Sequence, residues 1–174
     1  MKKLIQQNPK SQSGFTLIET LLYIGLFALV MTAILLATHQ LIELADKSQT
    51  RAQIEIESQF VLNKIDEALN GASIVAISEN NGIQTLNITN PSLSSGQSPV
   101  VITRDDVNSS VSLQRGMHPA TKLNGTIAPV SSLDFVVINT EITQTLKTSL
   151  MITSPLLATP QTYTSIRTIR KNGN

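Results

Sequence analysis

Residues 13–38 read SGFTLIETLLYIGLFALVMTAILLAT, and the plan of the molecule follows from them. From Thr20 to Thr38 the chain holds 19 residues with no charge and no proline. At the rise of an α-helix this run spans about 30 Å, the thickness of the hydrocarbon core of a bilayer. The run is too long for a core helix in a domain this small. It predicts a helix that crosses a membrane.

A polar segment precedes the apolar run. Residues 1–14 carry Lys2, Lys3 and Lys10 and no acidic residue. A secretory signal peptide places its apolar region before the cleavage site, whereas here the small residue Gly14 lies before the apolar run. The polar leader can therefore be removed while the helix stays on the mature protein. The lysines place the amino-terminal side in the cytoplasm and the rest of the chain outside.

Glu19 is a carboxylate inside an apolar sequence. Such a charge costs about 2.5–3.5 kcal/mol near the bilayer centre. The dipole at the start of a helix offsets only about 0.3–1 kcal/mol of that cost. The mature helix offers no lysine or arginine before Lys47. The nearest available cation is the amino group that cleavage before Phe15 would create, so the amine of one subunit could meet Glu19 of its neighbour.

Residues 13–22, SGFTLIETLL, together with the apolar run resemble the type IV prepilin signal of pilins and pseudopilins. The resemblance implies that a prepilin peptidase cuts after Gly14 and that the new amino-terminal Phe15 is methylated. It also implies that the charge of Glu19 guides docking of the subunit into a growing filament. The alternative is a plain single-pass membrane anchor with an accidental match.

The resemblance also implies partners and a location. The subunit would sit first in the bacterial inner membrane and then enter an extracytoplasmic filament whose core is made of packed apolar helices. The partners would be other pilin or pseudopilin subunits, an inner-membrane assembly platform and a cytoplasmic ATPase. No cofactor is implied.

Two departures from many major pilins favour a minor subunit. No proline interrupts the apolar helix, since the chain has none between Pro9 and Pro91. The chain also lacks the carboxy-terminal cysteine pair. A long helix, many short strands and a final IRTIRK segment at residues 166–171 weakly resemble the J-type pseudopilins of type II secretion.

The helix is predicted to continue to about Asn70-Gly71, where the glycine can end it. Its second half carries two apolar stripes at about 100° per residue. The first stripe holds Leu41, Ala45, Ala52, Ile56 and Phe60, and the second holds Ile54, Val61, Ile65, Leu69 and Ala72. We interpret the second stripe as the seam against a sheet and the first as a continuation of the filament-facing surface. One wide core-facing surface is an equal alternative.

Beyond Gly71 the pattern changes to short strands. Residues 73–78 and 83–89 flank Glu79-Asn80-Asn81-Gly82, a strong signal for a hairpin turn. Further strands are expected at 100–104, 107–114, 132–139, 145–153 and 163–170, with loops at 90–99 and 116–129. The pattern predicts an α+β fold in which an antiparallel sheet packs on the second half of the helix, because neither can bury its apolar face alone.

The predicted organisation has three parts. Residues 1–14 form a cleaved leader, and residues 15–40 form a transmembrane helix that becomes part of the filament core. Residues 41–174 form a periplasmic or extracellular pilin-like domain.

The composition argues against several classes of function. The chain has no cysteine, hence no disulfide and no thiolate nucleophile or metal ligand. Its formal net charge of +1 gives no basic face for nucleic acid. His39 and His118 lie far apart in sequence, and no catalytic set, phosphate loop or metal spacing is present. We therefore expect no enzyme.

Two weaker clusters were considered as sites. Asp105, Asp106 and Asp134 could suggest calcium, although a solvated turn is the better interpretation. A basic patch at the carboxy terminus could touch DNA phosphates in an uptake pilin, although a solvated strand end is the better interpretation. The patch consists of Arg167, Arg170 and Lys171.

Three hypotheses about function follow. The first is a filament subunit, and the second is a membrane-tethered binding module or adhesin that would need neither Gly14 nor Glu19. The third is a DNA-uptake pilin, a variant of the first.

Overall fold

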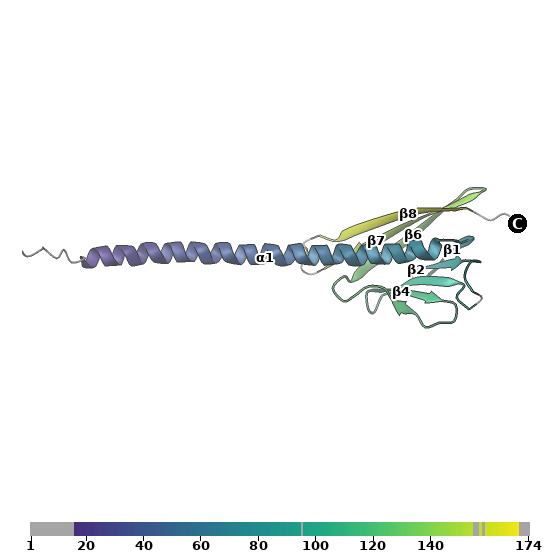
Figure 1. The fold of residues 1–174 in the computed structure, drawn as a ribbon, viewed down its shortest axis with the longest axis horizontal. Helices are drawn as coiled ribbons and strands as arrows, with labels where there is room; N and C mark the ends of the chain where they lie inside the picture. The colour runs from purple at the N-terminus through teal and green to yellow at the C-terminus, as the bar shows by residue number, and fades with distance from the viewer. Residues whose placement is uncertain (1–15, 95, 155–156, 158, 171–174) are drawn as a thin grey trace, which may run out of the picture. The chain divides into compact units, whose positions relative to one another are not determined.

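The structure is a computed structural model that describes residues 16–94, 96–154, 157 and 159–170. Within these ranges one long helix, α1 (Leu17–Leu69), is followed by eight strands. The chain divides into two compact units between Ala45 and Asp46. Residues of α1 belong to both units (Figure 1).

The first unit is the amino-terminal part of α1. Its large apolar side chains are exposed from Leu17 to Leu44. The hydroxyls of Thr20, Thr32 and Thr38 each donate to a backbone carbonyl three or four residues earlier, at 2.8 Å. These hydroxyls are therefore satisfied within the helix, as an apolar environment requires. By length and composition α1 is able to cross a membrane.

The carboxy-terminal end of α1 belongs to the second unit. The helix ends at Leu69, and Gly71 has a φ of +80°, which favours glycine. A side chain at Gly71 would also come within 3.0 Å of the Ser92 hydroxyl. The Asn90 side chain donates to the Asn70 carbonyl at 2.7 Å and so satisfies one of the last carbonyls of the helix. The predicted end at Asn70-Gly71 is confirmed.

The first five strands form an antiparallel sheet in the order β1-β2-β3-β4-β5. They are β1 (Ile74–Asn80), β2 (Ile83–Thr89), β3 (Val100–Asp105), β4 (Ser110–Arg115) and β5 (Thr121–Lys122). Between β1 and β2, Asn81 and Gly82 both have positive φ, at 51° and 79°. This is the backbone of a two-residue hairpin turn that matches the twist of the strands, so the predicted hairpin is confirmed.

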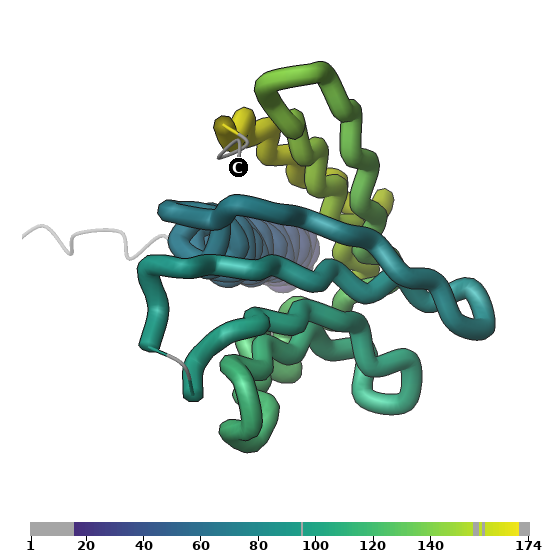
Figure 2. Tube along the Cα trace, turned by 90° about the vertical axis from the view of Figure 1, so that its right-hand side faces the viewer, coloured from purple at the N-terminus to yellow at the C-terminus, as the bar shows by residue number. Residues whose placement is uncertain are grey.

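The last three strands form a second antiparallel sheet in the order β6-β7-β8. They are β6 (Val130–Asn139), β7 (Thr143–Ile152) and β8 (Gln161–Arg170). In Figure 2 the β6–β7 hairpin rises on one side of the β1–β2 hairpin, and β3 and β4 lie on the other side. The α+β class is confirmed, but the strands form two sheets where the sequence suggested one.

Glutamine side chains join the two sheets. Gln144 on β7 accepts a hydrogen bond from the Val75 N–H at 3.0 Å and donates to the Val75 carbonyl at 3.3 Å. Gln84 on β2 accepts from the Phe135 N–H at 2.6 Å. Backbone groups of β1 and β6 are thus satisfied by amide side chains instead of by a neighbouring strand. The two sheets are therefore linked here by side-chain hydrogen bonds and not by backbone pairing of strands.

Replacing Gln144 by Ala is expected to lower the free energy of unfolding by about 2 kcal/mol, because the buried polar groups of Val75 lose their partner. The measurement is a denaturant titration of the full-length chain in detergent micelles, followed by circular dichroism. Gln161→Ala is the matched control, since among the described residues that side chain bonds to Thr159, two positions earlier. Equal losses in both variants would contradict the proposed joint.

The strands differ most from the sequence-based expectation around β4 and β5. β4 begins at Ser110 and not at Val107. The Asp105 carboxylate accepts hydrogen bonds from the N–H groups of Val107 and Asn108, at 2.9 and 3.3 Å, and holds these residues in a turn. The segment 116–129, expected to be a loop, contains the two-residue strand β5.

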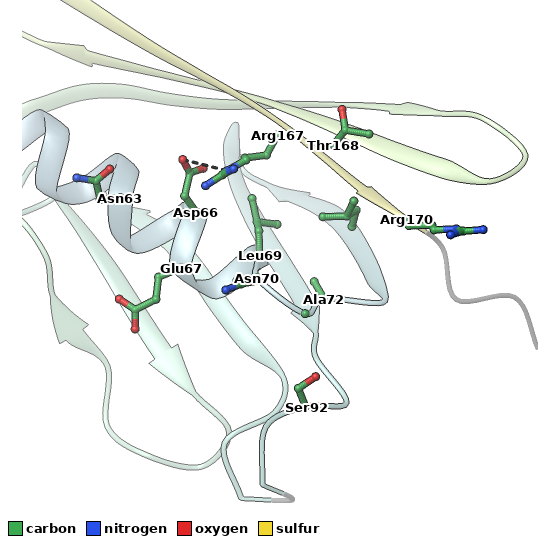
Figure 3. Close-up of a pocket in the computed structure, with 12 residues that line it drawn as sticks. Asn63, Asp66, Glu67, Leu69, Asn70, Ala72, Ser92, Arg167, Thr168 and Arg170 are labelled. Carbon is green, nitrogen blue, oxygen red and sulfur yellow. Dashed lines mark ion pairs between the residues drawn. The ribbon is translucent and has the colours of Figure 1, made fainter.

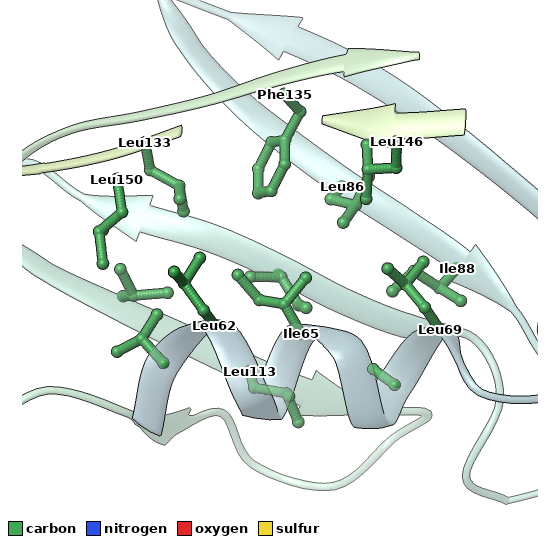
Figure 4. Close-up of a cluster of buried hydrophobic side chains, with 14 of the residues drawn as sticks. Leu62, Ile65, Leu69, Leu86, Ile88, Leu113, Leu133, Phe135, Leu146 and Leu150 are labelled. Carbon is green, nitrogen blue, oxygen red and sulfur yellow. The ribbon is translucent and has the colours of Figure 1, made fainter. Parts of the chain in front are cut away.

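The core lies between the second half of α1 and the sheets (Figure 4). Leu62, Ile65 and Leu69 of α1 are buried with side chains from both sheets, including Phe135 and Leu86. All five residues of the second stripe are buried, which confirms that stripe as the seam. The first stripe is exposed along its whole length, so the alternative of one wide core-facing surface is wrong.

Candidate functional site

The candidate site lies where α1 begins. The predicted cleavage and methylation positions, Gly14 and Phe15, lie outside the described residues. The Thr16 hydroxyl oxygen accepts from the Glu19 N–H at 3.4 Å. The Thr16 carbonyl accepts from the N–H groups of Glu19 and Thr20, at 3.0 and 3.2 Å. Thr16 therefore caps the helix directly after the predicted cleavage position.

Glu19 lies in the first turn of α1. A negative charge is favoured there by the helix dipole. Glu19 is half-buried, whereas every other residue from Thr16 to Gln49 is exposed. One turn further along, the Tyr23 hydroxyl donates to Glu19 Oε1 at 3.5 Å. The role of Glu19 in docking stays a prediction. The structure shows that its carboxylate accepts a hydrogen bond from a side chain of the same helix.

The sequence analysis missed both Thr16 and Tyr23. A threonine three residues before a glutamate is the pattern of a helix N-terminal cap. Glu19 and Tyr23 are four residues apart, and side chains at this spacing are neighbours on a helix. Both signals were present in the sequence: Thr16 bonds to the backbone N–H of Glu19, and Tyr23 bonds to its carboxylate.

The cations considered at the carboxy terminus differ in their surroundings. Arg167 Nε lies 3.3 Å from Asp66 Oδ2 on α1. The Ser165 hydroxyl also donates to the Asp66 carboxylate, at 3.2 and 3.3 Å. Figure 3 shows Arg167 directed toward Asp66, while Arg170 is directed away from it. Lys171 lies outside the described residues.

The cleft beside this ion pair has a volume of about 720 Å³. Its walls carry the carboxylates of Asp66 and Glu67 as well as the guanidinium groups of Arg167 and Arg170. Carboxylates repel phosphate, so these mixed charges do not favour a binding site for a DNA backbone.

The three aspartates considered for calcium each bond to a protein partner. Asp106 pairs with Arg104, and Asp134 accepts from the Ser132 hydroxyl at 3.0 Å. Hydrogen bonds from the Asn108 side chain and backbone hold the pKa of Asp105 below its ordinary value. In the part of the chain that the structure describes, no cluster of three or more Asp, Glu, His or Cys side chains is placed to hold a metal.

The two histidines are exposed, His39 on α1 and His118 in the loop after β4. The side chain of His118 lines a cleft of about 410 Å³ with Lys64 and Arg115. Both cations pair with Glu67, at 2.6 and 3.1 Å, and they lower the pKa of that carboxyl. The Arg115–Glu67 pair joins α1 to β4, whereas Lys64 and Glu67 both lie on α1.

Residues 9–35 match the prokaryotic N-terminal methylation motif. No curated protein and no solved structure is significantly similar to the chain. The matched segment includes Gly14, Phe15, Glu19 and Tyr23. The motif is typical of structural subunits that a prepilin peptidase processes and that assemble with other pilins from a membrane. The chain therefore carries a type IV pilin-like prepilin signal, on an α+β protein whose first helix is apolar enough to anchor it in a membrane.

Proposed function

We propose that the chain is a structural subunit, in a minor position, of a type IV pilus-like or type II secretion pseudopilus filament. A prepilin peptidase removes residues 1–14 after Gly14, and Phe15 is methylated at its new amino group. Residues 15–40 first span the inner membrane and then pack in the filament core. Residues 41–174 lie outside the membrane and face outward from the filament.

The methylation motif at residues 9–35 carries this proposal. The geometry of the first turn supports it. Thr16 begins the helix directly after the cleavage position, and Glu19 then lies in the turn closest to the amine that cleavage creates. The exposed apolar side chains from Leu17 to Leu44 require lipid or other helices around them, and a filament core would supply the helices.

The intact mass of the full-length chain, purified from membranes with and without a co-expressed prepilin peptidase, tests the proposal. We expect the peptidase to remove residues 1–14 and the product to carry one added methyl group on Phe15. A known substrate of the peptidase serves as the positive control. An uncut chain beside a cut control would favour the membrane-tethered binding module.

The residues that the structure describes give no observation that favours DNA uptake. Arg167, one of the three cations on which that hypothesis depends, pairs with Asp66. The filament subunit therefore stands ahead of the uptake pilin, and the machine that uses the filament is left open between a pilus and a secretion pseudopilus.

A further inference from the structure

In the proposed function, the Glu19 carboxylate lies in the membrane without a neighbouring subunit until the chain is assembled into a filament. The sequence from Phe15 to Asp46 contains no lysine or arginine that could neutralise it. Of the two nearby threonines, Thr20 donates its hydroxyl to the Leu17 carbonyl, and the Thr16 hydroxyl oxygen accepts from the Glu19 N–H. Among the described residues, Tyr23 donates its hydroxyl to the Glu19 carboxylate, at 3.5 Å.

We propose that Tyr23 is a positioning residue for filament assembly, and that its hydroxyl holds the Glu19 carboxylate at the depth where the neighbour's amine meets it. This inference rests on the proposed function, since it assigns a role within the docking step. The half-burial of Glu19, on a stretch of helix that is otherwise exposed, agrees with a neighbouring side chain that covers it.

Helix geometry explains why a tyrosine at this position can act on Glu19. Side chains on an α-helix lean toward its amino terminus, so residue 23 covers the turn that contains residue 19. A carboxylate near a helix start would otherwise bend back toward the water at the interface, as long charged side chains do. Tyr23 lies on the opposite, membrane-inward side of Glu19 and draws the carboxylate inward.

The chemistry of tyrosine suits this task. Its ring is apolar and tolerates lipid, and its hydroxyl supplies one polar donor. The hydroxyl binds Oε1 of Glu19. Oε2 is not part of this bond and can accept from the amine of a second subunit. The carboxylate can thus be held by its own helix and still meet its docking partner.

The test compares variants of the full-length chain, expressed with a prepilin peptidase and a filament assembly machinery. The measurement is the amount of subunit in sheared filaments divided by the amount in membranes, with the cleaved fraction determined by mass in each sample. Y23F removes only the hydroxyl and is expected to lower this ratio about threefold to tenfold, the effect of losing one ordinary hydrogen bond, because this bond is long at 3.5 Å. Cleavage after Gly14 should be unchanged.

Two control variants separate this role from a general one. T32V removes a hydroxyl that bonds only to its own helix and should leave the ratio unchanged. The exchange Y23I/I24Y keeps the composition but shifts the tyrosine from about 40° to about 140° around the helix axis from Glu19. It should lower the ratio as much as Y23F does.

Three results would overturn the inference. They are a normal ratio in Y23F, a normal ratio in Y23I/I24Y, and a loss of cleavage in Y23F. A chain that is cleaved and assembled normally in all variants would leave the proposed function standing without the role of Tyr23. A wild-type chain that is never cleaved would instead remove the proposed function itself.

Discussion

Replacing Glu19 by Ala is expected to reduce incorporation into filaments by about 100-fold or more, while the amount of subunit in the membrane stays equal or rises. Removing one partner of a desolvated charge pair costs about 2–5 kcal/mol, and this leaves the neighbour's amine unpaired inside the filament core. Membrane insertion of the Glu19→Ala variant should be equal or more favourable, because inserting a carboxylate among apolar residues costs free energy. The measurement is the ratio of subunit in sheared filaments to subunit in membranes.

The matched control for this prediction is Glu55→Ala. Glu55 is an exposed carboxylate on the same helix, in the part that belongs to the second unit. Its replacement should leave both the filament and membrane fractions unchanged. If Glu19→Ala assembled as well as the Glu55 control, the carboxylate would have no docking role. A membrane tether would then explain the chain better.

Features that depend on a few adjacent residues could be predicted from the sequence. The end of α1 follows from Gly71, and the β1–β2 hairpin follows from Asn81-Gly82, because only certain residues adopt positive φ readily. The membrane helix and the methylation motif are likewise local patterns. Each of these predictions rests on the chemistry of one short segment and needs no knowledge of distant partners.

Features that depend on residues far apart in sequence could not be predicted. Gln144 and Val75 are 69 positions apart, and Phe135 and Gln84 are 51 positions apart. Nothing in the local pattern of a polar glutamine within a strand indicates that it will satisfy the backbone of another sheet. The pairing of Arg167 with Asp66 could not be predicted for the same reason, so that a cation in a structural contact was interpreted as part of a solvated strand end.

The two apolar stripes of α1 could be predicted only in part from the sequence. Helical periodicity shows which residues share a face, but it does not show whether a sheet covers one face or both. The structure separates them, because Ile65 of the second stripe is 0% exposed whereas Ile56 of the first is 68% exposed. The same residue type on one helix thus has two different environments, and a pair of substitutions can test both.

Replacing Ile65 by Ala is expected to lower the free energy of unfolding by about 3–4 kcal/mol, because the change removes buried methyl groups and leaves a cavity in the core. Ile56→Ala should change it by less than about 0.5 kcal/mol, since that side chain lies at the surface. Denaturant titration of each full-length variant in detergent micelles, followed by circular dichroism, measures the difference.

Among variants that remain folded, we expect the change at Ile56 to reduce filament assembly more than a conservative change at Ile65. If the first stripe faces other subunits in the filament, Ile56→Ala lowers the filament-to-membrane ratio without lowering stability. A conservative change at the seam, Ile65→Val, should cost only about 1 kcal/mol and leave assembly intact. If Ile56→Ala assembles normally and Ile65→Val does not, the exposed stripe is not the filament-facing surface, and the subunits must meet through another face of the protein.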